Sequence, residues 1–457
     1  MTRKMTDASC RLDLLPSEVL LLIFDYCNEY DLTRLSEVCK RFYEIIHSDI
    51  AWTKKSKTFL VTNQISERFR KRCNTLLHPR AAWSVSYNWH YGIYSKENVF
   101  SRNDKNLMPW LRMTNNVLWW SGTGYGLYGF KRHERTPFEY SSTNKFTFSF
   151  YYNVSLYSGA DISKFIVWNN FIICGYTDGA IIYFMTNLKK RKSATMLWPK
   201  SFLSCVNAID ATPKNVIVGS ERGEVKMFRH PGIVNVPTWD YSDVSNTDVS
   251  NTEVTTKTKV TDRYTKEICN INLVDKVQSL SVDPTGVRFA VGSSGITDVP
   301  LHVINVERYT MVDKIQHDWK YGAGILDMVW DDPNTLLTCG YDTYIRKWDM
   351  RTGRCVCSWV DPYDATLYCI ASDYRYTMIT GTQYNCLAVL WDQRKSDFVQ
   401  LYYVNSKESS RRSPIYSVQF DNTQLYCATD RHMIELDFSV HSYRKRDYKS
   451  LFIPCTR

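Results

Sequence analysis

Hydrophobic and polar positions alternate in short runs between Gly324 and Trp359, in the stretch GILDMVWDDPNTLLTCGYDTYIRKWDMRTGRCVCSW. Asx, Pro and Gly turns separate four such runs, which are Ile325–Trp330, Thr335–Cys339, Tyr344–Trp348 and Cys355–Trp359. Runs of about five residues joined by tight turns predict a four-stranded antiparallel sheet rather than helices. One such sheet cannot bury both of its faces, so we expect further sheets of the same kind.

The turn between the second and third runs recurs along the chain. Turns of this kind begin at Gly122, Gly175, Gly219, Gly292, Gly340, Gly381 and Thr429. Where the register is clearest they lie about 43 positions apart, which is the period of WD-repeat propellers. Trp348-Asp349 and Trp391-Asp392 end the third strand of their repeats and carry the dipeptide for which WD repeats are named. The chain therefore resembles a WD-repeat protein, and the resemblance implies a mainly β fold with a seven-bladed β-propeller.

Residues 12–57 follow a helical pattern instead. Apolar side chains recur at three- and four-residue spacing on one helical face, at Leu20, Ile23, Phe24 and Cys27. Pro16 fits the first helical position, where its missing amide hydrogen costs nothing. We expect Asp31 to cap a second helix, and Ser48 or Asp49 to cap the last turn before Trp52.

The same segment resembles an F-box. The resemblance rests on Leu15-Pro16-x-Glu18-x-Leu20, then Leu35-Ser-x-Val-Cys-x-x-Phe, then Ala51-Trp52. It implies binding to the Skp adaptor and, through the adaptor, to a cullin scaffold. The contact residues that it implies are Leu15, Pro16, Ile23, Leu35, Val38, Cys39 and Trp52. The alternative is a small helical bundle that packs on the propeller.

These patterns divide the chain into a polar lead (1–11), an F-box (12–57), a connector (58–101) and a propeller (102–457). The connector is helical at first, with a basic cluster at Glu67–Arg72, and then rich in aromatic residues. We expect the basic cluster to face solvent, with phosphate binding as the alternative. Residues 238–266 are rich in Ser, Thr and Asn, which predicts a mobile loop. Either terminus could close the propeller, and Leu451-Phe452-Ile453 is one candidate for the closing strand.

Composition adds limits to this interpretation. The chain has 457 residues, 44% of them hydrophobic, which suits one large core with a small second domain. The formal charge of +10 indicates either an anionic partner or a uniformly basic surface. The 14 cysteines lie mostly in apolar runs without a CxxC pair, which is typical of reduced thiols. No apolar signal segment precedes the F-box pattern. We expect a cytoplasmic protein, with the nucleus as a further location.

No set of catalytic residues emerges from the sequence. The nine histidines show no metal-ligand spacing, and neither a Gly-x-Ser-x-Gly elbow nor a phosphate loop is found. We therefore expect a non-enzyme without cofactor or metal. Candidate binding residues lie on the tight turns, namely Tyr125, Tyr176, Arg222, Tyr341, Tyr384 and Arg431. Tyr offers large contact area and Arg can pair with a carboxylate or phosphate. The alternative is that the Tyr rings pack between neighbouring blades.

Together, an F-box and a WD propeller resemble the F-box/WD-repeat substrate receptors of Skp–cullin–F-box ubiquitin ligases. The span from Gly322 to Asp392 is most similar to the dactylin-type members. The resemblance implies that the propeller binds a protein target, phosphorylated or not, and that neither nucleic acid nor membrane is a partner. The turn at Asp430-Arg431 is similar to Arg-bearing turns of receptors for phosphorylated targets. The alternative is a propeller scaffold without a role in ubiquitin transfer.

Overall fold

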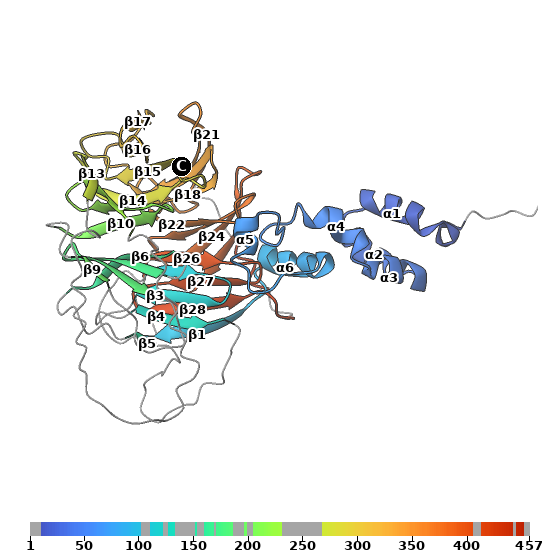
Figure 1. The fold of residues 1–457 in the computed structure, drawn as a ribbon. Helices are drawn as coiled ribbons and strands as arrows, with labels where there is room; N and C mark the ends of the chain where they lie inside the picture. Colours follow the sequence, from blue (N-terminus) through green and yellow to red (C-terminus); the bar gives the residue numbers. More distant parts are fainter. Residues whose placement is uncertain are drawn as a thin grey trace, which may run out of the picture. The chain divides into compact units, whose positions relative to one another are not determined.

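The structure is a computed structural model that describes residues 11–101, 110–121, 127–132, 151–152, 160–168, 171–185, 196–198, 204–230, 267–404, 413–441 and 445–451. The chain forms two compact units. The first unit comprises Met1–Gly159 and Gly322–Arg457, and the second unit comprises Ala160–Tyr321. Helices lie near the N-terminus of the first unit, and strands make up most of the rest (Figure 1).

Four antiparallel sheets of four strands belong to the first unit. They are β2–β5 (Leu111–Met113, Val117–Ser121, Leu127–Lys131, Tyr151–Tyr152), β18–β21 (Ile325–Asp332, Thr335–Gly340, Tyr344–Asp349, Arg354–Val360), β22–β25 (Leu367–Ser372, Thr377–Thr382, Leu387–Asp392, Phe398–Tyr403), and β26–β28 (Ser417–Phe420, Gln424–Ala428, His432–Asp437) completed by β1 (Ser95–Ser101). The strands predicted from Ile325 to Trp359 are present within a residue or two of the expected bounds.

Three further sheets form the second unit. They are β6–β9 (Ile162–Trp168, Phe171–Tyr176, Ile181–Met185, Met196–Trp198), β10–β13 (Val206–Ala211, Asn215–Ser220, Glu224–Arg229, Glu267–Asn272) and β14–β17 (Val277–Val282, Arg288–Ser293, Leu301–Asn305, Met311–Lys314). The predicted mobile loop at 238–266 lies outside the described residues. The seven sheets described in the two units confirm the mainly β, propeller-type fold.

Equivalent positions make equivalent bonds in different sheets. Trp348 Nε1 donates to Thr338 Oγ1, and Trp391 Nε1 donates to Thr380 Oγ1, both at 2.9 Å. Each bond ties the third strand of a sheet to its second strand and satisfies a donor on a fully buried indole. The Trp of the Trp-Asp pair is thus a core residue with a fixed orientation.

Strand β1 closes the last sheet from the N-terminal side. It pairs antiparallel with β28, so that Ser95 lies opposite Asp437. The residues that form β1 fall in the segment predicted as a connector, and the connector therefore ends before Ser95. Leu451 lies in a turn rather than in a strand, and Phe452 and Ile453 lie outside the described residues. The C-terminal candidate for the closing strand is replaced by β1.

The helical module consists of a 3₁₀ turn, η1 (Leu12–Leu14), and four helices, α1 (Ser17–Tyr26), α2 (Glu29–Leu35), α3 (Lys40–His47) and α4 (Ile50–Ser56). Pro16 is the N-cap of α1 and not, as expected, its first helical residue, which is Ser17. The cap of α2 is Asn28, whose Oδ1 accepts the Asp31 amide at 2.8 Å. Our prediction of Asp31 as the cap is therefore wrong. Asp49 precedes α4 without a side-chain capping bond.

The core of the helical module forms where the apolar faces of α1–α4 meet. Phe24 and Phe42 pack edge to face with ring centroids 5.4 Å apart. Trp52 is 2% exposed, and its Nε1 donates to the Ile46 carbonyl at 2.7 Å. Leu20 and Phe24 point inward from α1, as the predicted helical face requires. The opposite side of α1 is consequently left for solvent or a partner.

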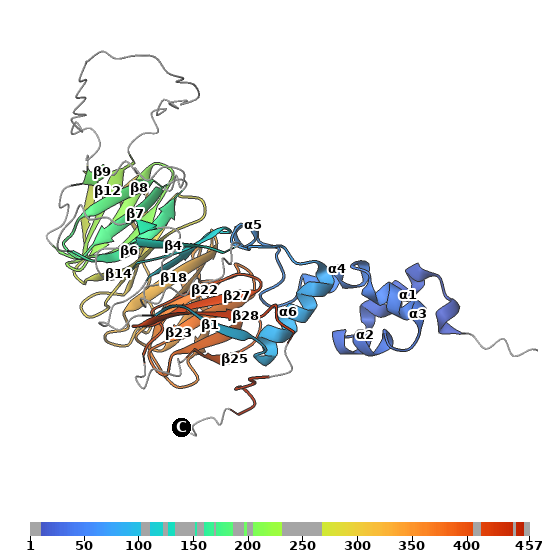
Figure 2. The same cartoon turned by 90° about the horizontal axis from the view of Figure 1, so that it is seen from below.

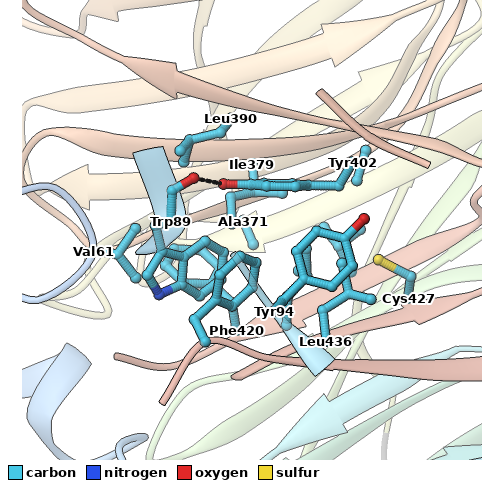
Figure 3. Packing of buried hydrophobic residues seen from close by; sticks show 14 of the residues in the cluster. Val61, Trp89, Tyr94, Ala371, Ile379, Leu390, Tyr402, Phe420, Cys427 and Leu436 are labelled. Carbon is cyan, nitrogen blue, oxygen red and sulfur yellow. Dashed lines mark hydrogen bonds between the residues drawn. The ribbon is translucent and has the colours of Figure 1, made fainter. Parts of the chain in front are cut away.

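Helix α6 (Pro79–Tyr91) has two apolar faces. Ala82 and Trp83 pack in the core of the helical module, while Val85 and Trp89 pack in the core of the sheets. Both views show α6 between α4 and the sheets of the first unit (Figure 1; Figure 2). Trp89 stacks on Phe438 with centroids 3.7 Å apart, and the Tyr402 hydroxyl donates to the Trp89 carbonyl at 2.5 Å (Figure 3). This helix therefore joins the helical module to the sheets.

The basic cluster at Glu67–Arg72, which includes the short helix α5 (Glu67–Arg70), packs on the same sheets. Arg68 donates to the Trp330 carbonyl at 2.8 Å and lies over the ring of Tyr374. Arg72 donates to the Ser372 carbonyl at 2.8 Å. Glu67, Arg68, Arg70 and Lys71 are exposed, as expected, whereas Arg72 is half-buried. The guanidinium groups of Arg68 and Arg72 bond backbone carbonyls, so these contacts do not support the alternative of phosphate binding.

Candidate functional site

An apolar stripe runs along the outer side of α1. Val19, Leu22 and Tyr26 follow one another at helical spacing, so they lie on one side of the helix, opposite Leu20 and Phe24. Leu15 precedes them in the extended residues just before α1. Leu22 is 63% exposed and Tyr26 is 93% exposed, whereas Leu15 is half-buried. A helix that is apolar on both sides needs a second surface to cover the outer one. We call these four residues the α1 stripe.

The start of the α1 stripe is held in place by α3. Arg41 donates to the Asp13 carbonyl at 2.7 Å and to the Leu15 carbonyl at 2.5 Å. These charge-assisted bonds satisfy carbonyls of the turn that precedes α1, and they fix Leu15 and Pro16 against the module. At the other end of α1, Lys55 donates to the carbonyls of Asp25 and Cys27. The stripe is therefore presented on a helix that is anchored at both ends.

A second exposed apolar residue lies at the corner between α2 and α3. Val38 is 68% exposed, while Leu35 is half-buried beside the module core. Cys39 is the N-cap of α3, and its Sγ accepts the Phe42 amide at 3.5 Å. A Cys at this position thus contributes to the helix start as well as to the surface. The Val38 amide donates to the Leu35 carbonyl at 3.1 Å, so Leu35, Val38 and Cys39 lie in one tight turn between α2 and α3.

The structure separates the predicted adaptor residues into two groups. Leu15, Pro16, Ile23, Leu35, Val38 and Cys39 are exposed or half-buried, so they can contribute to a surface. Trp52 cannot, because its ring is enclosed in the module core and stacks on Trp83 with centroids 5.9 Å apart. Trp52 consequently supports the module rather than forming its outer surface.

Eight exposed apolar or aromatic residues of the helical module were not predicted from the sequence. They are Leu12, Leu14, Val19, Leu22, Tyr26, Tyr30, Tyr43 and Ile50. The signal for two of them was present, because Leu22 and Tyr26 continue from Leu15 at seven- and eleven-residue spacing. The predicted helical face comprised Leu20, Ile23, Phe24 and Cys27 alone. A second apolar stripe on the same helix is the feature that would have revealed them.

Tyrosines gather on the turn side of the first unit. Tyr341 and Tyr384 are exposed, as predicted for binding residues on these turns. Tyr368 and Tyr416 pack edge to face with each other, with ring centroids 5.4 Å apart. Burial, followed by the nearby Tyr341 and Tyr384 hydroxyls, raises the pKa of Tyr368.

Asp430 lies near these tyrosines. The pKa of Tyr416 is raised first by burial, then by Tyr368 and then by the charge of Asp430. We call the four tyrosines, Tyr341, Tyr368, Tyr384 and Tyr416, the tyrosine cluster. Tyr368 and Tyr416 were missed because they lie near the start of inner strands, not on the turns that set the repeat register. Tyr368 falls in the β-bulge between Leu367 and Cys369. Bulges re-aim side chains and recur next to functional sites.

The remaining turn residues do not form one group. Tyr176 is 0% exposed, so it is a core residue of the second unit and the packing alternative holds for it. Arg222 is exposed on a turn of the second unit. Arg431 is half-buried in the first unit. Tyr125 lies outside the described residues. Of the six predicted residues, the structure therefore brings Tyr341 and Tyr384 into the tyrosine cluster.

The described residues offer neither a metal site nor a reactive thiol. No group of three or more His, Cys, Asp or Glu side chains in the described part of the chain could hold a metal ion. The described cysteines are free thiols. Burial raises the pKa of the Cys73 thiol to about 12, which keeps it protonated and unreactive at neutral pH. No described helix is both long enough and apolar enough to cross a bilayer.

Known proteins resemble this chain at both of its parts. The F-box-like family profile matches residues 12–58. F-box/WD repeat-containing protein 4 of Mus musculus and of Homo sapiens are each 26% identical to it over 429 residues, which is 93% of this chain and 92% of each relative. A chain in the crystal structure of a mitotic checkpoint complex matches with a TM-score of 0.51 at 12% identity, covering 76% of this chain and 94% of that one. This last similarity concerns the fold alone.

Proposed function

We propose that this chain, which is an F-box/WD-repeat protein, is the substrate-recognition subunit of a Skp–cullin–F-box ubiquitin ligase. The observation that carries the proposal is the α1 stripe. It is an uncovered apolar surface on the segment that matches the F-box-like profile, and it lies apart from the sheets. An exposed apolar surface of this kind marks a protein–protein interface.

In this role the chain acts by proximity. The helical module holds the adaptor, the sheets hold a target, and a separate enzyme of the complex transfers ubiquitin. Tethering the target raises its effective concentration at that enzyme without any bond being made or broken by this chain. Connector contacts support the role, because α6 packs in the cores of both the helical module and the sheets.

The α1 stripe is tested by comparing two exposed leucines. We expect Leu22→Asp to weaken binding of the Skp adaptor by about tenfold or more, because it places a charge in the centre of an apolar interface. Leu76 is 60% exposed and Leu22 is 63% exposed, so Leu76→Asp is a matched control outside the stripe. Adaptor and cullin retained by each tagged full-length variant are measured by pull-down and immunoblot.

Both leucines are on the surface, so neither change should unfold the protein, and circular dichroism checks this. If wild type and Leu76→Asp retain the adaptor and Leu22→Asp does not, the receptor function is supported. If folded wild-type protein retains no adaptor, the proposal fails. The α1 stripe then serves another partner, and a propeller scaffold without a role in ubiquitin transfer becomes the better explanation.

We propose further that the tyrosine cluster contributes to target binding. Large aromatic side chains with few torsions dominate the energetics of protein interfaces. In proximity labelling, the wild-type protein enriches a set of neighbouring proteins. We expect the enrichment of these proteins to fall by about tenfold in the Tyr368→Ala/Tyr416→Ala variant, while adaptor binding is unchanged. Tyr321→Ala, at an exposed tyrosine of the second unit, is the control. Unchanged enrichment in the double variant would contradict the assignment.

A further inference from the structure

A cavity of about 430 Å³ lies between the helical module and α6. Its lining comes from α2, α3, α4 and α6, and no residue of α1 contributes. Ser36, Ile46 and Trp52 belong to the module core and form its inner side. The volume falls within the range of about 300–1,000 Å³ that is usual for small-molecule sites. The cavity is therefore separate from the α1 stripe and large enough for an organic ligand.

Aromatic rings form one wall of the cavity. Trp83 of α6 is central, with the Tyr30 ring edge to face at 5.5 Å and the Tyr87 ring at 5.8 Å between centroids. Two polar contacts hold these tyrosines, since the Tyr30 hydroxyl bonds the Tyr91 hydroxyl at 2.8 Å and Lys445 Nζ donates to the Tyr87 hydroxyl at 2.6 Å. The wall is thus prearranged, and a flat ring can pack against it at little cost in side-chain entropy.

Positive charge surrounds this wall. Arg34 of α2 and Arg80 of α6 both line the cavity, and both are exposed, so their guanidinium groups can be reached from solvent. Neither guanidinium has a carboxylate partner among the described residues. His47 also lines the cavity, and none of the lining residues is acidic.

The charge around Tyr87 has the same sign. Lys445 adds a positive charge beside the Tyr87 ring, 5.0 Å from its centroid. Three acidic side chains lie nearby: Asp49 faces His78 at 3.5 Å, Glu29 acts on Tyr30, and Asp447 acts on Lys445. None of the three lines the cavity. Two unpaired guanidinium groups in the same cavity form an arrangement that favours a carboxylate, sulfonate or phosphate.

We propose that this cavity binds a small organic anion that carries a flat aromatic ring. The ring packs against Trp83 with Tyr30 and Tyr87, and the anionic group is held by Arg34 and Arg80. Because α2 and α6 supply one arginine each, the ligand connects the helical module to the connector. The cavity is distinct from the α1 stripe, since no residue of α1 lines it.

The test uses the full-length chain and three probes. 2-Naphthoate carries both a flat ring and a carboxylate, 2-naphthamide has the same ring without charge, and acetate has the charge without a ring. Binding is measured by isothermal titration calorimetry. We expect 2-naphthoate to bind with a dissociation constant of about 1 mM or lower, and each of the other two to bind about tenfold more weakly or worse.

Three variants locate the binding. Arg34→Gln/Arg80→Gln should weaken 2-naphthoate binding by about tenfold or more, because it removes both charge-assisted contacts. Arg70→Gln/Arg354→Gln makes the same change of charge at two exposed arginines that do not line the cavity, and it should leave binding unchanged. Ser84→Trp introduces an indole at a lining residue and should exclude the probe.

The inference is overturned if 2-naphthoate does not bind wild type at about 1 mM. It is overturned equally if the Arg34→Gln/Arg80→Gln variant binds it as wild type does, or if 2-naphthamide binds as tightly. Adaptor binding by the same variants is measured in parallel. Since the α1 stripe is untouched in them, loss of probe binding with adaptor binding intact separates this site from the proposed ligase function.

Discussion

Replacing Arg132 by methionine is expected to lower the free energy of unfolding of the first unit by about 3–5 kcal/mol, the usual cost of breaking a buried ion pair from one side. The side chains of Arg132 and Asp421 pair directly, and both are 0% exposed. Methionine would leave the Asp421 carboxylate without its cation in the interior. Urea unfolding followed by circular dichroism measures the change.

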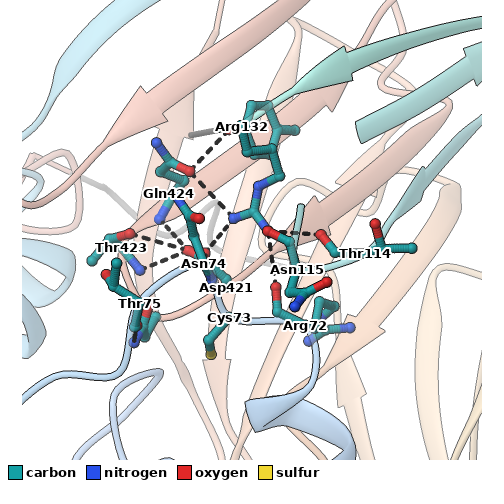
Figure 4. A network of polar contacts seen from close by, with 12 residues as sticks. Arg72, Cys73, Asn74, Thr75, Thr114, Asn115, Arg132, Asp421, Thr423 and Gln424 are labelled. Carbon is teal, nitrogen blue, oxygen red and sulfur yellow. Dashed lines mark hydrogen bonds and ion pairs between the residues drawn. The ribbon is translucent and has the colours of Figure 1, made fainter. Parts of the chain in front are cut away.

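The expected loss of stability is large because the Arg132 guanidinium binds several partners. Its Nη1 donates to the carbonyls of Arg72 and Thr114, each at 2.9 Å, and its Nη2 contacts Gln424 Oε1 at 3.3 Å besides Asp421 (Figure 4). Although burial opposes the charged form, the Asp421 carboxylate raises the pKa of Arg132. One guanidinium thus joins the connector, the β2–β3 turn and the start of β27.

A double-mutant cycle separates the pair from its surroundings. Asp421 Oδ1 also accepts the amides of Thr423 and Gln424 at 2.8 and 2.7 Å, and Asn preserves that acceptor. Arg132→Met/Asp421→Asn should therefore be more stable than Arg132→Met alone. Arg351→Met is the control, since Arg351 forms an exposed pair with Asp349. Equal losses in the single and double variants would contradict an energetic role of the pair.

Trp89→Ala is expected to cost a similar amount, about 3–5 kcal/mol, because it empties a large volume in the interior. Trp89 is 0% exposed and lies in the largest described core cluster, among residues of α6 and of two sheets (Figure 3). Its Nε1 donates to the Asn422 carbonyl at 3.1 Å. The alanine variant therefore loses ring packing, an indole hydrogen bond and the stack on Phe438 together.

Trp89→Phe is the informative companion. It keeps a ring against Phe438 but loses the donor to Asn422, so it should recover part of the stability lost in Trp89→Ala. The urea midpoint by circular dichroism is the measurement, since fluorescence would change with the tryptophan itself. Midpoints of both variants close to that of wild type would show that α6 is not anchored through this ring.

Local pattern was sufficient for the elements themselves. The alternation from Ile325 to Trp359 predicted β18–β21, because strand period and turn chemistry are properties of neighbouring residues. Helical spacing around Leu20 and Phe24 likewise identified the inner face of α1. The segment that matches the F-box-like profile was recognisable for the same reason, since its helices are short and its spacing is local.

The closing strand and the environment of single side chains were decided by contacts across the chain. β1 is a strand because Ser95 meets Asp437, and no pattern near Ser95 reveals that partner. Arg68 and Arg72 read as a solvated face but bond carbonyls of the sheets. Sequence distance hides such contacts, because each depends on where two remote segments pack.

In the candidate sites, too, some features follow from local sequence and others from contacts between remote segments. The sequence alone determined that the protein combines an F-box-like helical segment with repeated four-stranded sheets, and it indicated Leu15, Tyr341 and Tyr384 as surface residues. Only the tertiary structure decided that Trp52 and Tyr176 are enclosed, and that Arg34 and Arg80 line one cavity. The physical reason is that periodicity fixes which side of an element is apolar, whereas burial depends on what packs against that side.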